Sequence, residues 1–291
     1  MKNLKKPPWL KKRIPPYQDL LKVKSILAAT DLHTVCEEAR CPNLGECFSR
    51  GTATFLILGE VCTRNCGFCA VQHGNPAPPA EDEPNRIIRA VLEMGIRYAV
   101  ITSVTRDDLP DGGASFFART ISAIREQDQG IKIEVLVPDF RGDLSSLETI
   151  LRTSPDVLNH NVETIARLYP QVRPQADYKR SLDLLKKSKE LYPHIHTKSG
   201  FMLGLGETQE EVLELLRDLR NTGCDFLTIG QYLQPRQDRL PVVRYVPPEE
   251  FDMYKKVGLE MGLKAVASGP FVRSSFHASE LFENIPFSAT T

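Results

Sequence analysis

Short apolar segments alternate with longer amphipathic ones between residues 52 and 232. Several of the short segments are rich in β-branched and aromatic residues, which favours strands. The predicted strands cover residues 52–58, 98–103, 132–137, 157–162, 197–203 and 226–232. Apolar residues between them recur at helical spacing over residues 85–94, 114–127, 144–152, 178–191 and 208–221. The pattern therefore predicts six strands, each followed by a helix.

Two details of this pattern bear on the fold. The helix at 208–221 starts with Thr208 and has Glu211 three residues later, as in a capping box. Nearly continuous apolar runs at 55–58 and 99–101 suit a parallel sheet that is buried on both faces. Strands joined by helices imply right-handed parallel crossovers, in either an open doubly wound sheet or a partial barrel. Both arrangements place function at the carboxyl ends of the strands.

The two ends of the chain depart from this rhythm. Residues 1–24 are basic and rich in Pro, which indicates either a solvated, partly disordered arm or a docking strip for an acidic partner. A mitochondrial transit peptide is disfavoured because Pro breaks the helix that such peptides need. The segment from Val266 onward is predicted to be irregular and to fold back over the barrel mouth. We therefore divide the chain into an N-terminal extension (1–50), a barrel (51–264) and a C-terminal segment (265–291).

Composition narrows the class of protein. The chain has 291 residues, of which 41% are hydrophobic and 25% charged, as in ordinary globular proteins. Lys and Arg number 37, as do Asp and Glu, so the zero net charge gives no indication of a nucleic-acid or acidic-membrane partner. Neither a membrane-spanning apolar run nor a signal peptide is evident, and we expect a cytoplasmic protein without nucleic-acid or membrane partners.

The cysteines carry the clearest chemical signal. Six of the seven lie between Cys36 and Cys69, which favours metal binding or catalysis over disulfides in a reducing compartment. The triplet Cys62-x3-Cys66-x2-Cys69 follows the first predicted strand. Three thiolates on one loop can hold three irons of a [4Fe–4S] cluster and leave the fourth iron open for chemistry. A structural zinc site is the alternative, but such a site needs four protein ligands, and the chain has no second C-x2-C pair to complete it.

With Phe68 before its last Cys, this triplet resembles the radical S-adenosylmethionine (SAM) superfamily. The resemblance implies that the open iron binds the amino and carboxylate groups of SAM, and that one electron from the cluster yields a 5′-deoxyadenosyl radical. It also implies polar strand-end residues around the cofactor. The candidates, with Phe68, are Asn161, Glu163, Arg173, Lys198 and Ser199, although strand alternation lets only one of Lys198 and Ser199 face inward. Asn161 and Glu163 could instead be ordinary loop hydrogen-bond partners. Gly204-Leu-Gly-Glu-Thr208 resembles the superfamily's glycine-rich turn.

A second triplet, Cys36-x4-Cys41-x5-Cys47, lies upstream of the barrel. Taken alone, it could also be a structural metal clip or a set of inert thiols. Together with residues 104–113, 159–164 and 273–278 it resembles the lipoyl synthase family, over about residues 20–280. One departure is Phe276, where many members have Tyr; an aromatic packing role survives that change, but a hydroxyl role does not.

This resemblance implies a partial (β/α)6 TIM-like barrel whose N-terminal extension carries an auxiliary iron–sulfur cluster. The implied reaction inserts two sulfur atoms at C6 and C8 of an octanoyl chain amide-linked to a lysine of a lipoyl carrier protein. A second [4Fe–4S] cluster would donate the sulfur and be held by Cys36, Cys41, Cys47 and a Ser of the Arg-Ser-Ser motif. Ser275 matches that position best, with Ser274 as the alternate.

The implied partners are octanoylated carrier domains, namely E2 subunits of 2-oxoacid dehydrogenases and the H protein of glycine cleavage, and an electron donor such as flavodoxin or ferredoxin. One alternative is another radical SAM sulfur-inserting enzyme, of the biotin synthase or methylthiotransferase kind. A second is a non-catalytic iron–sulfur electron carrier, which leaves the barrel and its strand-end polar residues unexplained. The lone Cys224 is predicted to be a buried small residue.

Overall fold

The computed structural model describes residues 5–12 and 17–283; residues 1–4 and 13–16 of the predicted arm and 284–291 of the predicted C-terminal segment lie outside them. In the described part of the chain, the main sheet has eight strands in the order β1-β2-β5-β6-β7-β8-β9-β10. These are β1 (His33–Thr34), β2 (Thr54–Ile57), β5 (Tyr98–Ser103), β6 (Lys132–Leu136), β7 (Val157–Asn159), β8 (His196–Leu203), β9 (Phe226–Gln231) and β10 (Ala265–Gly269). The strands from β2 to β10 pair in parallel, and β1 pairs antiparallel with β2. A separate small sheet joins β3 (Val61–Cys62) to β4 (Gln72–His73).

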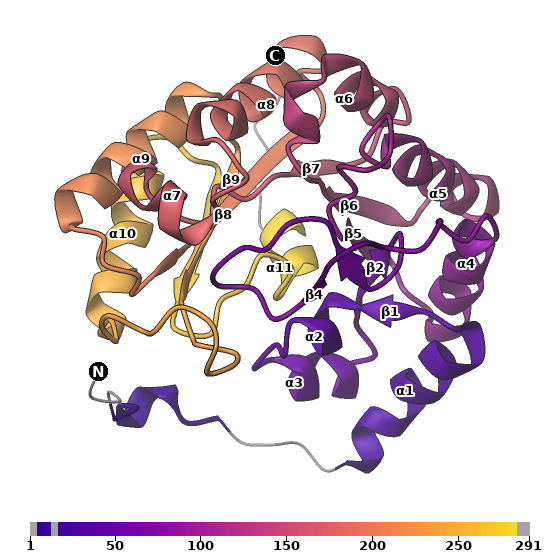
Figure 1. Ribbon diagram of the computed structural model, residues 1–291, viewed down its shortest axis with the longest axis horizontal. Coiled ribbons are helices and arrows are strands. Elements are labelled where there is room, and N and C mark those ends of the chain that lie inside the picture. The colour runs from indigo at the N-terminus through magenta and orange to yellow at the C-terminus, as the bar shows by residue number, and fades with distance from the viewer. Residues whose placement is uncertain (1–4, 13–16, 284–291) are drawn as a thin grey trace.

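Helices surround the curved sheet on its outer side (Figure 1). The crossover helices are α4 (Glu83–Met94), α5 (Ala114–Gln127), α6 (Leu144–Leu151), α8 (Tyr178–Leu191), α9 (Gln209–Asn221) and α10 (Pro248–Glu260). Shorter or flanking helices are η1 (Pro8–Leu10), α1 (Gln18–Thr30), α2 (Val35–Glu38), α3 (Leu44–Ser49), η2 (Phe140–Gly142), η3 (Ala166–Leu168), α7 (Tyr169–Val172) and α11 (Ala278–Glu283). The parallel α/β architecture expected from the sequence is confirmed.

All six predicted strands and all five helices with predicted ranges are present, with ends that differ by at most three residues. The capping box is also present, because Thr208 accepts a bond from the Glu211 amide and Glu211 accepts one from the Thr208 amide. The prediction of an irregular chain from Val266 onward was wrong. Ala265–Gly269 forms β10, which pairs with β9, and α11 follows. Its small residues have little strand propensity of their own, so the pairing partner decides its structure.

Apolar residues fill the layer between the sheet and its helices. All four residues of β2 are buried, as are all six of β9. One buried cluster joins β2, β5 and β6 to α4, α5 and α6, and a second joins β8 and β9 to α9 and α10. Strands held on both faces in this way present their carboxyl ends as a rigid rim. Within the described residues no helix is both long and apolar enough to cross a bilayer.

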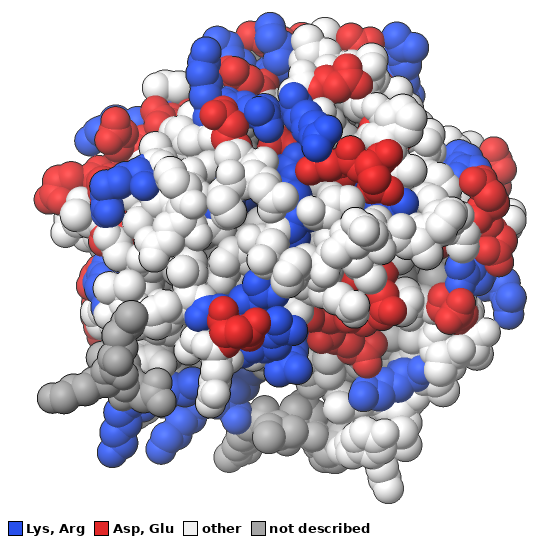
Figure 2. Space-filling view, in the orientation of Figure 1, with Lys and Arg blue, Asp and Glu red and all other residues white. Residues whose placement is uncertain are grey.

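The described part of the basic arm lies against the body of the molecule. Lys12 Nζ contacts Glu46 Oε2 on α3 at 2.7 Å and Asn43 Oδ1, just before α3, at 2.6 Å. The same ammonium lies 5.3 Å from the ring centre of Phe271 and 4.9 Å from that of Phe276. Lys and Arg side chains gather at the margin of the face where the arm lies, while the middle of that face is largely uncharged (Figure 2). Lys12 therefore ties the arm to the C-terminal segment.

Candidate iron–sulfur and SAM site

Two adjoining cavities collect the cysteines of both triplets. The larger, about 490 Å³, opens among the carboxyl ends of the strands and the loops around them. The smaller has a volume of about 270 Å³. Predicted site residues in the larger lining are Cys36, Cys41, Cys62, Cys66, Phe68, Cys69, Asn161, Glu163, Arg173, Ser274 and Ser275. Those in the smaller are Cys36, Cys41, Cys47 and Ser275, so Cys36, Cys41 and Ser275 border both.

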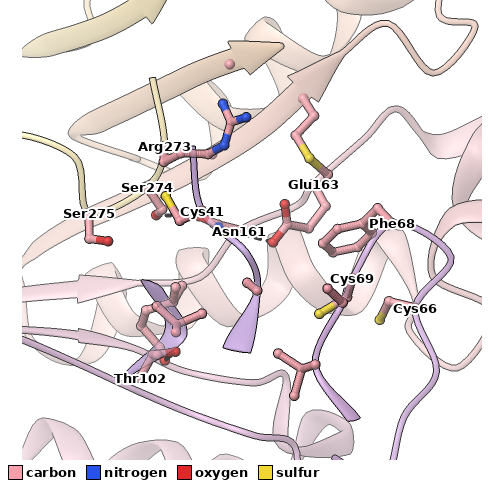
Figure 3. A pocket seen from close by; sticks show the side chains of 18 of the residues that line it. Cys41, Cys66, Phe68, Cys69, Thr102, Asn161, Glu163, Arg273, Ser274 and Ser275 are labelled. Carbon is pink, nitrogen blue, oxygen red and sulfur yellow. Dashed lines mark hydrogen bonds between the residues drawn. The ribbon is translucent and has the colours of Figure 1, made fainter. Parts of the chain in front are cut away.

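The two sets lie on opposite sides of the space between them. Figure 3 shows Cys66, Phe68 and Cys69 on one side and Cys41, Arg273, Ser274 and Ser275 on the other, with Asn161 and Glu163 in between. Residues more than 200 positions apart along the sequence thus line one continuous space.

The loop that carries Cys62, Cys66 and Cys69 is anchored by a buried arginine. Arg64 donates two bonds to Asp107, at 2.7 and 2.9 Å, and one of 2.6 Å to Asp139. Its side chain is 3% exposed and that of Asp139 is not exposed at all. Asp107 follows β5 and Asp139 follows β6, so the guanidinium fastens the cysteine loop to the ends of two strands.

Burial disfavours the ionised form of these thiols unless a cation binds. Burial raises the pKa of Cys36 and of Cys69 to about 12, and that of Cys47 to about 11. Burial also raises the pKa of Cys66. A thiolate is the form that ligates metals, and a bound cation compensates for the buried negative charge. Cys224 lies apart from both cavities and is 2% exposed, as predicted for a buried small residue.

The spacing of the sulfurs distinguishes a cluster from a single ion. Thiolates that share one zinc ion lie about 3.8 Å apart, given tetrahedral geometry and a Zn–S distance of about 2.3 Å. Among the described residues, only His33, Glu38 and Glu60 bring three ligand atoms within 4.8 Å of one another, and these lie outside both cavities. Neither cysteine triplet is drawn together tightly enough for one zinc ion. Three thiolates in each set are the protein donors that a [4Fe–4S] cluster with one further ligand position needs.

Asn161, Glu163 and Arg173 meet between the two cysteine sets. Glu163 has a left-handed backbone, with φ of 65°, a strained conformation that often marks functional sites. Asn161 Nδ2 donates to Glu163 Oε1 at 3.1 Å, and burial raises the pKa of Glu163. Arg173 donates to the Asn161 carbonyl at 2.8 Å, while its buried Nε has no partner among the described residues. A carboxylate and a guanidinium with a free donor suit the two charged groups of an amino acid.

Lys198 and Ser199 lie outside the lining of the cavity. Lys198 faces inward, as one of the pair was expected to, but it forms a buried ion pair with Glu134 at 2.9 Å. Ser199 Oγ accepts a bond from the Val162 amide at 3.3 Å. The turn 204–206 also lies outside the lining, and its three amides donate to Glu207. The structure therefore brings none of these groups to the space between the cysteine sets.

The two serines of the Arg-Ser-Ser motif have different surroundings. Ser275 Oγ accepts a bond of 2.8 Å from Thr54 on β2 and lies among the upstream cysteines. Ser274 Oγ instead bonds to Asn159 and Asn161. The segment can pass this close to the sheet because position 230 is Gly: a Cβ there would collide with the Val272 carbonyl.

Several site residues were not singled out from the sequence. Arg64 and Asp139 anchor the cysteine loop, Thr54 contacts Ser275, and Lys12 holds the C-terminal segment. A basic residue inside a cysteine loop and an Asp just after a strand are local signals that could have suggested the first two. Thr54 and Lys12 gain their roles only from contacts across more than 200 residues.

Comparisons with known proteins agree with this geometry. Residues 56–219 match the radical SAM superfamily, and residues 1–41 match the N-terminal domain of lipoyl synthase. A lipoyl synthase of Rubrobacter xylanophilus is 57% identical over 279 residues, which are 96% of this chain and 87% of that protein. A lipoyl synthase of Caldanaerobacter subterraneus subsp. tengcongensis is 56% identical over 276 residues, 95% of this chain and 96% of that protein.

Solved structures show the same fold at low sequence identity. HydG, a maturase of the FeFe-hydrogenase, superposes with a TM-score of 0.58 at 16% identity, over 84% of this chain and 64% of that one. Methylornithine synthase (PylB) gives a TM-score of 0.50 at 15% identity, over 85% of this chain and 82% of that one. From the family matches, the near full-length relatives and the site geometry, we conclude that this chain belongs to the lipoyl synthase family of radical SAM enzymes.

Proposed function

We propose that this protein inserts two sulfur atoms, at C6 and C8, into an octanoyl chain that is amide-linked to a lysine of a lipoyl carrier domain. The observation that carries this proposal is the pair of three-cysteine sets on adjoining cavities that share Cys36, Cys41 and Ser275. A reaction that generates a radical at one cluster and takes sulfur from another needs both within reach of one substrate chain.

In this proposal, Cys62, Cys66 and Cys69 hold the cluster that binds SAM. When bound, this cluster and SAM supply the one-electron chemistry that removes hydrogen from unactivated C–H bonds. The chain's own residues would bind and orient SAM: Glu163 would accept from its amino group, and Arg173 would pair with its carboxylate, since both residues line the larger cavity. Phe68 and Asn161 line the same space.

Cys36, Cys41, Cys47 and Ser275 hold the second cluster, which donates the sulfur. A hydroxyl oxygen is a harder ligand than thiolate and suits iron–sulfur clusters less well. Ser275 would therefore hold its iron less firmly than a fourth thiolate would, which suits a cluster that serves as a sulfur donor. Thr54, which donates to Ser275 Oγ at 2.8 Å, holds that side chain beside the upstream cysteines.

The cavity also suits an alkyl chain. Buried apolar side chains of Leu56, Val104 and Val137 line it. Burying seven methylene-scale groups at about 0.8 kcal/mol each would contribute roughly 5–6 kcal/mol before ordering costs. The octanoyl chain can therefore be drawn in mainly by the hydrophobic effect.

The protein partners follow from the substrate. We propose octanoylated carrier domains of E2 subunits and of the glycine cleavage H protein, and flavodoxin or ferredoxin as the electron donor. The exposed Lys5, Lys6 and Lys11 suit an acidic carrier surface, and Lys6 also borders the larger cavity. The arm would thus meet the carrier at the entrance that the octanoyl chain must use.

The decisive experiment is anaerobic turnover with SAM, a reductant and an octanoylated carrier, followed by mass spectrometry of the carrier. We expect about eight irons per loaded chain, from two [4Fe–4S] clusters. Cys66→Ala should abolish release of 5′-deoxyadenosine, whereas Cys41→Ala should spare much of it and abolish sulfur insertion. Cys224→Ala is the matched control, because that thiol borders neither cavity. Normal lipoyl product from Cys41→Ala would overturn the sulfur-donor assignment, and no 5′-deoxyadenosine from the parent would indicate an electron carrier.

A further inference from the structure

A line of buried polar side chains runs from the barrel interior to the C-terminal segment. Lys198 on β8 donates to both carboxylate oxygens of Glu134 on β6, at 2.9 and 3.0 Å, and these side chains are 1% and 0% exposed. Glu134 Oε1 also accepts from Asn159 Nδ2 at 2.8 Å, and the same nitrogen donates to Ser274 Oγ at 2.8 Å. Ser274 Oγ in turn donates to Asn161 Oδ1 at 3.0 Å. The line thus joins three inner strands, β6, β7 and β8, to the Arg-Ser-Ser motif.

The charged end of this line fixes the direction of its hydrogen bonds. A carboxylate only accepts, so Asn159 must turn its amide nitrogen toward Glu134. Both bonds from that nitrogen are then made, and the buried Oδ1 of Asn159 has no partner among the described residues. An unpartnered buried acceptor is unfavourable, so the ion pair, rather than Asn159 itself, sets this orientation. Ser274 Oγ therefore accepts from Asn159 and has its hydrogen left for Asn161.

Ser274 connects this line to the second cysteine set. Its neighbour Ser275 points to Thr54 and borders both cavities, whereas Ser274 points to the end of β7. Fixing the side chain of Ser274 from within the barrel restrains the backbone that carries Ser275. On its other side the line continues from Asn161 to Glu163, which borders the larger cavity.

We propose that the Glu134–Lys198 ion pair, acting through Asn159, holds Ser274 and so sets the position of Ser275 at the second cluster. These are positioning residues, since neither charged side chain borders the cavities. The proposal rests on the proposed function only in taking Ser275 as a ligand of the sulfur-donating cluster. Displacements of about 1 Å at a reacting centre can cost about a hundredfold in rate. Loss of the restraint on Ser274 should therefore slow sulfur insertion while SAM cleavage continues.

The test separates positioning from stability. Lys198→Met leaves a buried carboxylate without its cation and should destabilise the chain. Adding Glu134→Gln removes that charge, so stability should recover relative to the single variant. A Gln amide can both donate and accept, however, and the direction of the line is no longer fixed. Asn159→Leu interrupts the line and leaves the ion pair in place. Ser188→Ala is the matched control, because this buried hydroxyl bonds to the Leu184 carbonyl within its own helix.

Three quantities are measured on anaerobic protein loaded with both clusters and SAM: the thermal midpoint, the rate of iron loss to a chelator, and the ratio of lipoyl product to 5′-deoxyadenosine. Relative to the parent, the double variant and Asn159→Leu should lose iron at least threefold faster and show at least a tenfold lower ratio of lipoyl product to 5′-deoxyadenosine. Ser188→Ala should match the parent in both quantities. If iron retention and product ratio in the double variant recover together with its thermal midpoint, the line is merely structural and the proposal is wrong. If the parent forms 5′-deoxyadenosine but no lipoyl product, the proposed function fails, and the chelator assay still decides the positioning role.

Discussion

Replacing Arg64 by Met tests how the cysteine loop is held. The guanidinium makes three hydrogen bonds of 2.6–2.9 Å to Asp107 and Asp139, and its side chain is 3% exposed. Removing one partner of a buried ion pair typically costs about 3–5 kcal/mol, because the remaining charge is left without compensation. Here Arg180, 3.2 Å from Asp139, and Arg141, 3.4 Å from Asp107, remain as partners, so this range is the upper bound of the loss. At about 2–4 °C per kcal/mol, a loss of that full size would lower the thermal midpoint by roughly 6–20 °C.

The loss should depend on pH with a definite sign. Burial alone opposes the charged form of Asp139, but the hydrogen bonds and charge of Arg64 outweigh this and hold its pKa well below the usual range. In the parent, the resulting stability is present above the unfolded pKa of about 3.9 and is lost only as the pH falls below it. In Arg64→Met the pKa of Asp139 should be higher than in the parent, because burial is then opposed mainly by Arg180 at 3.2 Å and the Arg141 amide at 3.1 Å, so protonation relieves the buried charge as the pH falls. The difference in thermal midpoint between Arg64→Met and the parent should therefore be larger at pH 8 than at pH 6.

The assay is anaerobic thermal unfolding followed by circular dichroism at both pH values. Arg236→Met is the matched control, because its 2.6 Å ion pair with Asp238 is solvent-exposed and should contribute little to stability. The double variant Arg64→Met, Asp139→Asn should regain much of the lost stability. The reasoning is refuted if Arg64→Met and Arg236→Met unfold within 2 °C of each other (about 1 kcal/mol or less), or if the loss at pH 6 equals that at pH 8.

Three further outcomes are expected. Ser275→Ala should keep forming 5′-deoxyadenosine and make little or no lipoyl product per loaded chain; Ser275→Cys should also impair turnover, because the iron that must leave has a better ligand. Replacing Lys5 and Lys11 by Gln, which leaves Lys12 in place, should slow association with a carrier domain at low salt and spare a short octanoyl-lysine peptide, since charge steering is screened beyond about 8 Å at physiological salt; equal losses on both substrates would point to a structural arm. Gly230→Ala should cost about 1–3 kcal/mol and lower iron loading at the second cluster, because a Cβ would collide with Val272; iron loading at the parent's level would show that the segment can move without consequence.

The sequence by itself determined the local structure and the type of chemistry. Hydrophobic periodicity located six strands and five helices, because each reflects which face of a short segment is buried. The spacing of the cysteine triplets pointed to iron–sulfur chemistry, because ligands on one loop are close together whatever the rest of the chain does. The capping box at Thr208 was equally visible, since its two partners are three residues apart.

Only the tertiary structure decided which distant groups meet. Lys198 was expected near the cofactor from its strand position, but the parallel pairing sets it level with Asn159 on β7 and on the same face as Glu134 on β6, with which it forms a buried ion pair. Ala265–Gly269 became a strand because β9 offers it an open edge, which no pattern within five small residues could indicate. The different roles of Ser274 and Ser275 likewise depend on distant partners. Ser274 bonds to Asn159, 115 residues away, and Ser275 bonds to Thr54, 221 residues away. Such contacts are set by the packing of whole elements, and a linear pattern carries no record of that packing.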